Sequence, residues 1–151
     1  MIKIGLFILP NYLTKQIVQN LKKIVKKKFG NQTYLDHLPH CTVYVFNTMK
    51  KNLNEIKKIK YVPTLKSKVF NIEKTDVFYN DPMTKKNTYF LKIKKNNFLK
   101  KLQKSFLKTL SKYSYKKKIR FSDKIMNQNY RSFGYPFVNS NWKPHFTIAS
   151  I

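Results

Sequence analysis

Two short segments of this chain are nearly identical, and both consist mainly of strand-forming residues. The first is Pro39-His40-Cys41-Thr42-Val43, and the second, 105 positions later, is Pro144-His145-Phe146-Thr147-Ile148. Each reads Pro-His-x-Thr followed by a β-branched residue, and together they hold two of the chain's three histidines. Side chains alternate between the two faces of a strand, so a His and a Thr two positions apart point the same way. The fold must therefore present an imidazole beside a hydroxyl on each of two strands that are far apart in the sequence.

The hydrophobic pattern around the motifs predicts a mixture of helices and strands. Apolar residues recur at helical spacing over residues 11–29, ending at Gly30-Asn31, and over residues 97–113, which Asn96 or Asn97 can cap; a short helix is expected over 53–59. Strands are predicted at 1–9, 41–46, 66–73, 76–79, 87–94 and 146–151, with a turn at 80–82. Residues 119–125 are ambiguous, and residues 126–143 are expected to form a long irregular loop. We therefore expect one α+β domain spanning residues 1–151.

The charge balance is strongly positive, with 32 Lys and Arg against 6 Asp and Glu and a net charge of +26. The abundance of Lys, Asn, Ile, Phe and Tyr is typical of an AT-rich genome, but that bias does not explain why Glu is so rare. A surface this positive attracts polyanions and raises their local concentration. The charge favours a nucleic acid or nucleotide partner without saying which one.

Several classes of protein are excluded or disfavoured by the same composition. No apolar run approaches the roughly 20 residues that a membrane span needs, so we expect no membrane association. The single cysteine, Cys41, excludes an internal disulfide and a four-thiolate zinc site, and it fits a reducing compartment such as the cytoplasm. The six carboxylates are scattered and include no paired acidic motif for a two-metal site. We expect a monomer that needs no metal and no cofactor.

Two motif strands lying next to each other would bring two imidazoles and two hydroxyls around one point. This set suits a phosphodiester, because one His can take a proton, the other can give one, and the hydroxyls can hold phosphate oxygens. An ordinary His titrates near pH ~6.5, so a neutral and a protonated copy coexist near neutrality. The sequence does not decide which His would be the base. The plainer interpretation is a pair of ordinary strand histidines whose neighbours satisfy them.

The two motifs, about a hundred residues apart and each in a β context, resemble those of the 2H phosphoesterase superfamily, which includes 2′-5′ RNA ligase-like proteins and cyclic phosphodiesterases. The resemblance implies a bilobal α+β fold in which two antiparallel-rich sheets are related by a pseudo-twofold, with helices outside and a central groove. It implies His40 and His145 as the acid–base pair, Thr42 and Thr147 as phosphate ligands, and no metal. The implied activity is hydrolysis of a 2′,3′-cyclic phosphate, a 2′-5′ phosphodiester or a cyclic oligonucleotide, with RNA ligation as a related reaction. The implied partners are RNA ends or such nucleotides.

Other residues near the motifs are candidates for binding the substrate. Tyr44 shares a strand face with His40 and Thr42 by alternation, and aromatic residues crowd the expected loop before His145. Aromatic rings beside a phosphate site can stack a base, and a guanidinium fork suits phosphate, although rings in such a loop can equally pack over the core. The predicted substrate-binding residues are Tyr44, Arg131, Tyr135, Trp142 and Lys143.

Two alternative functions remain open at this level. One is a non-catalytic, basic RNA-binding module that uses the same groove, and the other is a basic structural or ribosome-associated protein. Only the enzyme interpretation needs both histidines and both threonines. Cys41 occupies the x position of its motif, which points to the opposite face, so we expect a small core residue and not a nucleophile. His37 makes a poor metal signature with His40 and is expected to be a surface residue.

Overall fold

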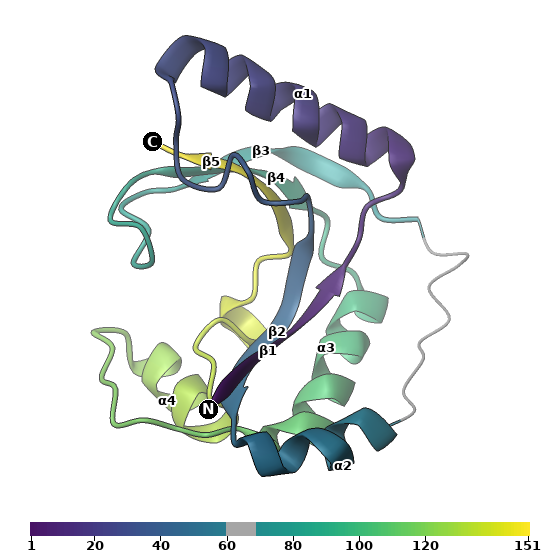
Figure 1. Ribbon diagram of the computed structural model, residues 1–151, viewed down its shortest axis with the longest axis vertical. Coiled ribbons are helices and arrows are strands. Elements are labelled where there is room, and N and C mark those ends of the chain that lie inside the picture. The colour runs from purple at the N-terminus through teal and green to yellow at the C-terminus, as the bar shows by residue number, and fades with distance from the viewer. Residues whose placement is uncertain (60–68) are drawn as a thin grey trace. The chain divides into compact units, whose positions relative to one another are not determined.

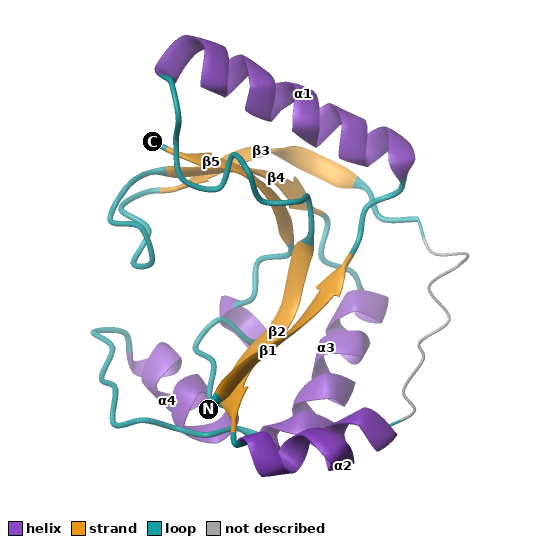
Figure 2. Cartoon of the chain, viewed as in Figure 1, coloured by secondary structure: helices purple, strands orange, loops and turns teal. Residues whose placement is uncertain are grey.

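The computed structural model describes residues 1–59 and 69–151 of the chain. Within these residues the fold is α+β, with four α-helices and two antiparallel sheets of two and three strands (Figures 1 and 2). The predicted strand at 66–73 falls partly on residues 60–68, which lie outside the described residues. The strands are β1 (Ile2–Ile8), β2 (Cys41–Thr48), β3 (Ile72–Phe78), β4 (Thr88–Ile93) and β5 (His145–Ser150), and the helices are α1 (Tyr12–Phe29), α2 (Leu53–Lys58), α3 (Asn97–Leu110) and α4 (Lys124–Phe133).

The two long helices lie where the sequence predicts, although α3 ends at Leu110 and is followed by a 3-10 turn over Ser111–Tyr113, short of the predicted end at 113. Asn11 caps α1, because its side chain accepts a hydrogen bond from the Thr14 N–H at 2.9 Å. Gly30 ends α1 with φ of 70°, a conformation that glycine adopts without steric cost. Asn96 caps α3 in the same way as Asn11 caps α1, accepting from the Leu99 N–H at 2.9 Å.

The predicted loop at 126–143 is wrong over its first half, because α4 occupies Lys124–Phe133. Asp123 caps this helix by accepting from the Met126 N–H at 2.7 Å, and Gly134 ends it with φ of 73°. Asn129, which is buried, donates to the carbonyl oxygens of residues 136 and 138, both at 3.1 Å. These side-chain bonds tie the helix to the segment that follows it.

Strands β3, β4 and β5 form the three-stranded sheet in that order, and each neighbouring pair is antiparallel. The sequence predicted a break between 73 and 76, but Ile72–Phe78 is one continuous strand. Its irregularity is instead a register shift between Ile72 and Lys74, where the pairing with β4 slips by one residue. Strand β1 pairs with β2 in the second sheet.

The chain divides into two compact units, each described here by itself. The first comprises residues 1–6, 42–69 and 95–143, and one cluster of its buried core residues consists of Tyr44, Phe46, Leu107, Leu110 and Val138. The second comprises residues 7–41, 70–94 and 144–151. In the second unit α1 lies across the three-stranded sheet (Figure 1) and contacts β5. Both motif histidines belong to this second unit.

Candidate functional site

The two Pro-His-x-Thr motifs have the same pattern of burial. In the first motif Pro39, Cys41 and Val43 are buried, whereas His40 and Thr42 between them are half-buried. In the second motif the Pro, Phe and Ile are buried, and the His and Thr are again half-buried. This alternation is that of a strand with one covered and one accessible face. Each motif therefore presents its imidazole and its hydroxyl on the accessible face, as the spacing predicts.

The pairing of β5 with β4 shows which residues share the face of His145. Paired residues lie on the same face of a sheet, and His145 pairs with Lys92 while Thr147 pairs with Phe90. The pairing then shifts, because Ala149, and not Ile148, is opposite Tyr89. Such a bulge changes the direction of neighbouring side chains and often lies beside functional sites. The face therefore carries an imidazole, a hydroxyl and an ammonium group on adjacent positions.

Aromatic rings surround the His145 imidazole. The ring centroids of Phe78 and Phe90 lie 5.1 Å and 4.8 Å from that of His145. Phe78 and Phe90 stack on each other at 4.1 Å, which explains why Phe90 is fully buried although it lies on the accessible face. These rings restrict the orientations of the imidazole, so the direction in which His145 can exchange a proton is limited.

The His40 imidazole is oriented by one hydrogen bond and one ring contact. Its Nδ1 lies 2.7 Å from the carbonyl oxygen of Leu38. A carbonyl can only accept, so Nδ1 carries the proton and Nε2 is the atom left for proton exchange with a ligand. Phe7 packs edge-on against the ring, with centroids 4.6 Å apart. Neutral His40 would accept a proton at Nε2, and protonated His40 would donate one from it.

One contact links the starts of β2 and β5 within the second unit. Burial raises the pKa of the Cys41 thiol to about 12, and a hydrogen bond with the His145 backbone acts in the opposite direction. A bond that lowers the pKa of an acid favours its anion, so the His145 N–H is the donor. Because Cys41 directly follows His40, standard bond lengths keep the Cα atoms of the two motif histidines within about 13 Å.

A second contact links the two motif segments within the first unit. The indole N–H of Trp142 donates to the carbonyl oxygen of Thr42 at 2.8 Å. Trp142 stands three residues before His145, and its side chain is only 4% exposed. This bond therefore ties the segment that enters the second motif to the strand that carries the first.

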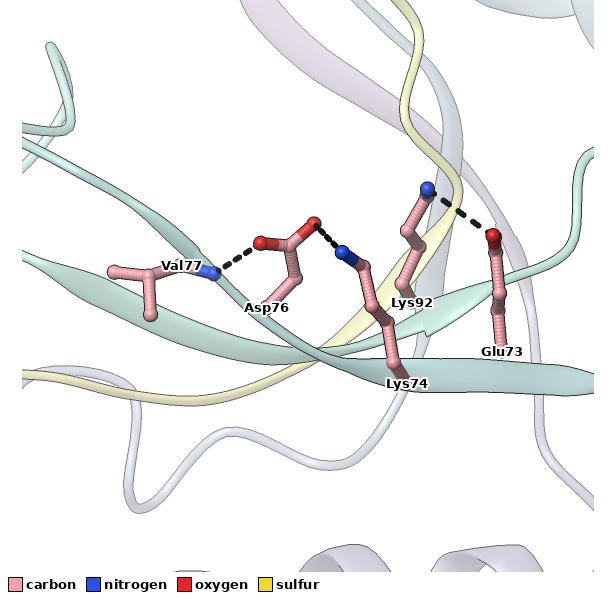
Figure 3. A network of polar contacts seen from close by, with 5 residues as sticks. All are labelled: Glu73, Lys74, Asp76, Val77 and Lys92. Atoms are coloured by element: carbon pink, nitrogen blue, oxygen red, sulfur yellow. Dashed lines mark hydrogen bonds and ion pairs between the residues drawn. The ribbon is translucent and has the colours of Figure 1, made fainter.

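Lys92 and Lys74 lie opposite each other in the pairing of β4 with β3, on the sheet face that carries His145, and each has an acidic partner (Figure 3). Lys92 forms an ion pair with Glu73 at 3.1 Å, and Lys74 lies 4.0 Å from Asp76. The Asp76 side chain also accepts from the Val77 N–H at 2.9 Å. These pairs are partly exposed, and such pairs contribute little to stability. Lys92, which lies opposite His145 in the strand register, is thus only weakly paired with Glu73.

Two of the predicted substrate-binding residues are corrected by their burial. Tyr44 is 0% exposed, packs on Phe46, and donates its hydroxyl hydrogen to the Phe133 carbonyl. Trp142 is nearly as buried, and Lys95 lies 5.6 Å from its ring centroid. Neither ring has an open face on which a base could stack, so both are core residues of the first unit.

For the other three predicted substrate-binding residues, which are Tyr135, Arg131 and Lys143, substrate binding stays a prediction. Tyr135 is half-buried, with its ring 6.4 Å from that of Tyr44. Arg131 is exposed in the last turn of α4, where a cation interacts favourably with the helix dipole. Lys143 is exposed immediately before the second motif.

Sequence reasoning missed Lys92, Phe78 and Phe90 as neighbours of His145. Lys92 stands out only as the polar residue between Leu91 and Ile93, which many strands show on their accessible face. Its place opposite His145 depends on the register of β4 against β5, and a one-residue slip would have moved it to the other face.

No family model matches the chain, and no curated protein or solved structure gives a significant match to it. Among the helices of residues 1–59 and 69–151, none combines the length and the apolar composition that crossing a membrane requires. In the same described part of the chain, no three or more His, Cys, Asp and Glu side chains form a group that could hold a metal ion.

Proposed function

We propose that this chain is a metal-independent phosphoesterase of the 2H type, which hydrolyses a 2′,3′-cyclic phosphate, a 2′-5′ phosphodiester or a cyclic oligonucleotide. The observation that carries the proposal is the pair of motifs with matching burial, whose starts are linked by the contact of Cys41 with the His145 backbone. An enzyme that transfers protons to and from one phosphate needs two such imidazoles within reach of it. Proposed partners are RNA ends and cyclic or 2′-5′-linked nucleotides, and the proposed setting is a monomer in the cytoplasm.

The reaction follows from the groups on the two strands. One motif histidine takes a proton from a water molecule as its oxygen bonds to phosphorus. The other gives a proton to the ribose oxygen as its bond to phosphorus breaks, so that protons and bonds balance. Thr42 and Thr147 donate hydrogen bonds to the phosphate oxygens, and the charge of Lys92 stabilises the negative charge that increases there. For a 2′,3′-cyclic phosphate the product is a phosphomonoester with one free ribose hydroxyl.

The finer architecture belongs to the same proposal. In it, the two motifs are related by a pseudo-twofold axis, in a bilobal arrangement, and face each other across a central groove. The matched burial of the motifs supports this relation. Each imidazole also has a phenylalanine packed edge-on against it, Phe7 on His40 and Phe78 on His145, which supports the same relation.

The test is turnover of a 2′,3′-cyclic nucleotide by the purified chain in excess chelator. We expect turnover to continue in chelator, and His40→Ala and His145→Ala each to lower kcat by at least about 100-fold, as the loss of an acid or base does. His37→Ala is the matched control, because His37 is exposed and stands three residues before His40. Thr42→Ala and Thr147→Ala should lose less than the histidine variants.

Two results would contradict the proposal. One is activity that chelator abolishes and magnesium or manganese restores. The other is a His40→Ala or His145→Ala variant that keeps near-wild-type activity. A chain that binds RNA in a salt-dependent way but turns over none of these substrates would favour the basic RNA-binding module, which the net charge of +26 also suits.

A further inference from the structure

A lysine holds the turn that precedes the first motif. Lys22 of α1 donates from its ammonium group to the carbonyl oxygens of Tyr34 and His37, both at 2.6 Å. These two carbonyls belong to the residues six and three positions before His40. The turn itself is closed by a bond from the His37 N–H to the Tyr34 carbonyl at 3.2 Å. Lys22 thus fixes the backbone that leads directly into the first motif.

A second lysine holds the turn that precedes the second motif in the same way. Lys95, between β4 and α3, donates to the carbonyl oxygens of Asn139 and Trp142 at 2.7 Å and 2.9 Å. These are again the residues six and three positions before the motif histidine, here His145. This turn is closed by a bond from the Trp142 N–H to the Asn139 carbonyl at 3.3 Å. The two lysines therefore bind equivalent carbonyl groups, counted from the histidine that follows.

The backbone of the two turns agrees as well. Tyr34 has φ of 74° and Asn139 has φ of 55°, values that residues other than glycine seldom adopt. Both occur at the position six residues before the histidine. Such a conformation persists where surrounding contacts hold it, and the two ammonium groups are contacts of this kind. The likeness of the two motifs therefore extends upstream from the Pro-His-x-Thr sequence to the turn and its lysine.

The two lysines differ from the many exposed lysines of this chain. Lys22 is only 6% exposed, and Lys95 is half-buried. Burial lowers the pKa of both side chains, with Asp36 opposing the effect at Lys22 and Lys100 adding to it at Lys95. Lys22 and Lys95 therefore occupy positions that disfavour a charged side chain, unlike the exposed lysines that give the chain its positive surface.

We infer that Lys22 and Lys95 are matched positioning residues, each holding the turn that places its motif histidine for proton transfer. Neither is a catalytic residue, because each acts on the backbone and not on the phosphate. The inference rests on the proposed function for its effect on turnover. Its geometric content, that each lysine orients one particular histidine, stands apart from turnover and can be measured separately.

The test replaces each lysine by methionine, whose unbranched side chain is similar in length but has no ammonium group to donate hydrogen bonds. For a 2′,3′-cyclic nucleotide we expect Lys22→Met and Lys95→Met each to lower kcat about 10- to 100-fold, the loss that a displacement of about 1 Å causes. KM should stay within about threefold, because substrate binding does not use these groups. In imidazole NMR spectra, Lys22→Met should shift or broaden the signals of His40 but not those of His145, and Lys95→Met should affect the signals of His145 but not those of His40. His37, whose own carbonyl accepts from Lys22, should respond to Lys22→Met as well.

Exposed neighbours supply the controls. Lys23→Met and Lys94→Met remove the same charge one residue away, and both should leave kcat and the imidazole signals unchanged. Lys95→Arg should keep roughly a third or more of the wild-type kcat, since a guanidinium can donate to both carbonyls. If Lys22→Met does not fold, the test relies on Lys95→Met, because Lys95 is only half-buried and its replacement disturbs the core less.

Two outcomes would overturn the inference. One is a Lys22→Met variant with the NMR signals of His40 at their wild-type positions, or a Lys95→Met variant with those of His145 unchanged. The other is a control variant that changes those signals equally. A wild-type chain without turnover would refute the proposed function, whereas the NMR comparison would still decide whether each lysine positions its histidine.

Discussion

Replacing Trp142 by Phe tests whether this ring ties the two motif segments together or recognises a base. The variant keeps an aromatic ring but removes the indole N–H that donates to the Thr42 carbonyl at 2.8 Å. Leaving a buried carbonyl oxygen without its hydrogen-bond donor lowers the free energy of unfolding by about 1–3 kcal/mol. The smaller ring leaves a cavity that adds about 1 kcal/mol, because the side chain is 4% exposed and its surroundings can close only in part. We expect the free energy of unfolding to fall by about 2–4 kcal/mol and the melting temperature by roughly 5–15 °C.

The assay is urea unfolding followed by far-UV circular dichroism, because the chain has a single tryptophan and the variant has no tryptophan fluorescence to follow. Tyr79→Phe is the control, since Tyr79 is 79% exposed and the loss of its hydroxyl should change stability by less than about 0.5 kcal/mol. Activity of Trp142→Phe should fall equally on a base-bearing substrate and on a bare phosphodiester. Unchanged stability, together with a KM that rises only for the base-bearing substrate, would refute the assignment of Trp142 to the core.

Three further changes follow from the described contacts. Lys92→Met should lower kcat/KM for a cyclic nucleotide about tenfold, because a charge-assisted contact to phosphate is lost, while the melting temperature stays close to wild type since the ion pair is partly exposed. An unchanged kcat/KM would show that Lys92 is not part of the site. The thiol of Cys41, whose pKa burial raises from 9.0 to about 12, should resist thiol reagents at pH 8 in the native chain. The unfolded chain loses that proton first, so unfolding free energy should fall as pH rises from 9.0 toward 12, less steeply in Cys41→Ala; equal slopes would contradict this. Gly134→Ala should destabilise by at least about 1–2 kcal/mol in thermal unfolding, because φ is 73° and the added Cβ would lie 2.6 Å from the Ser114 hydroxyl oxygen; a neutral effect would show that the turn yields.

The parts of the fold that sequence reasoning predicted are those determined by local patterns. Asn11 and Asn96 precede amphipathic segments and cap the helices that follow, and the alternation in both motifs correctly gives one accessible face. Helix α4 was missed although Met126, Tyr130 and Phe133 recur at helical spacing. The Asn and Ser residues of this segment favour turns and caps over helix interiors, and the bonds from Asn129 to the next segment form only in the folded chain.

The candidate site was predictable only as far as the motifs themselves. His40, Thr42, His145 and Thr147 were identified from a repeated pattern, whereas Lys92 depends on strand register, which a single bulge changes.

The roles of Lys22 and Lys95 could not be predicted from the sequence for a different reason. Both lysines bind backbone carbonyl groups, and every residue has such a group, so no residue type marks the position that a lysine will bind. The aromatic residues before His145 show the same limit, because composition alone does not distinguish a buried ring such as Trp142 from one that stacks a base.

The most direct test of the central claim is a pair of crystal structures of the chain with a nucleoside 2′-monophosphate and with a nucleoside 3′-monophosphate, the two phosphomonoesters that opening a 2′,3′-cyclic phosphate can give. The account predicts one phosphate group with Nε2 of both His40 and His145 within hydrogen-bonding distance, and the Thr42 and Thr147 hydroxyls on its other oxygens. Imidazoles on opposite surfaces, or more than roughly 10 Å apart with the phosphate bound elsewhere, would contradict it, because two groups so far apart cannot share one phosphate.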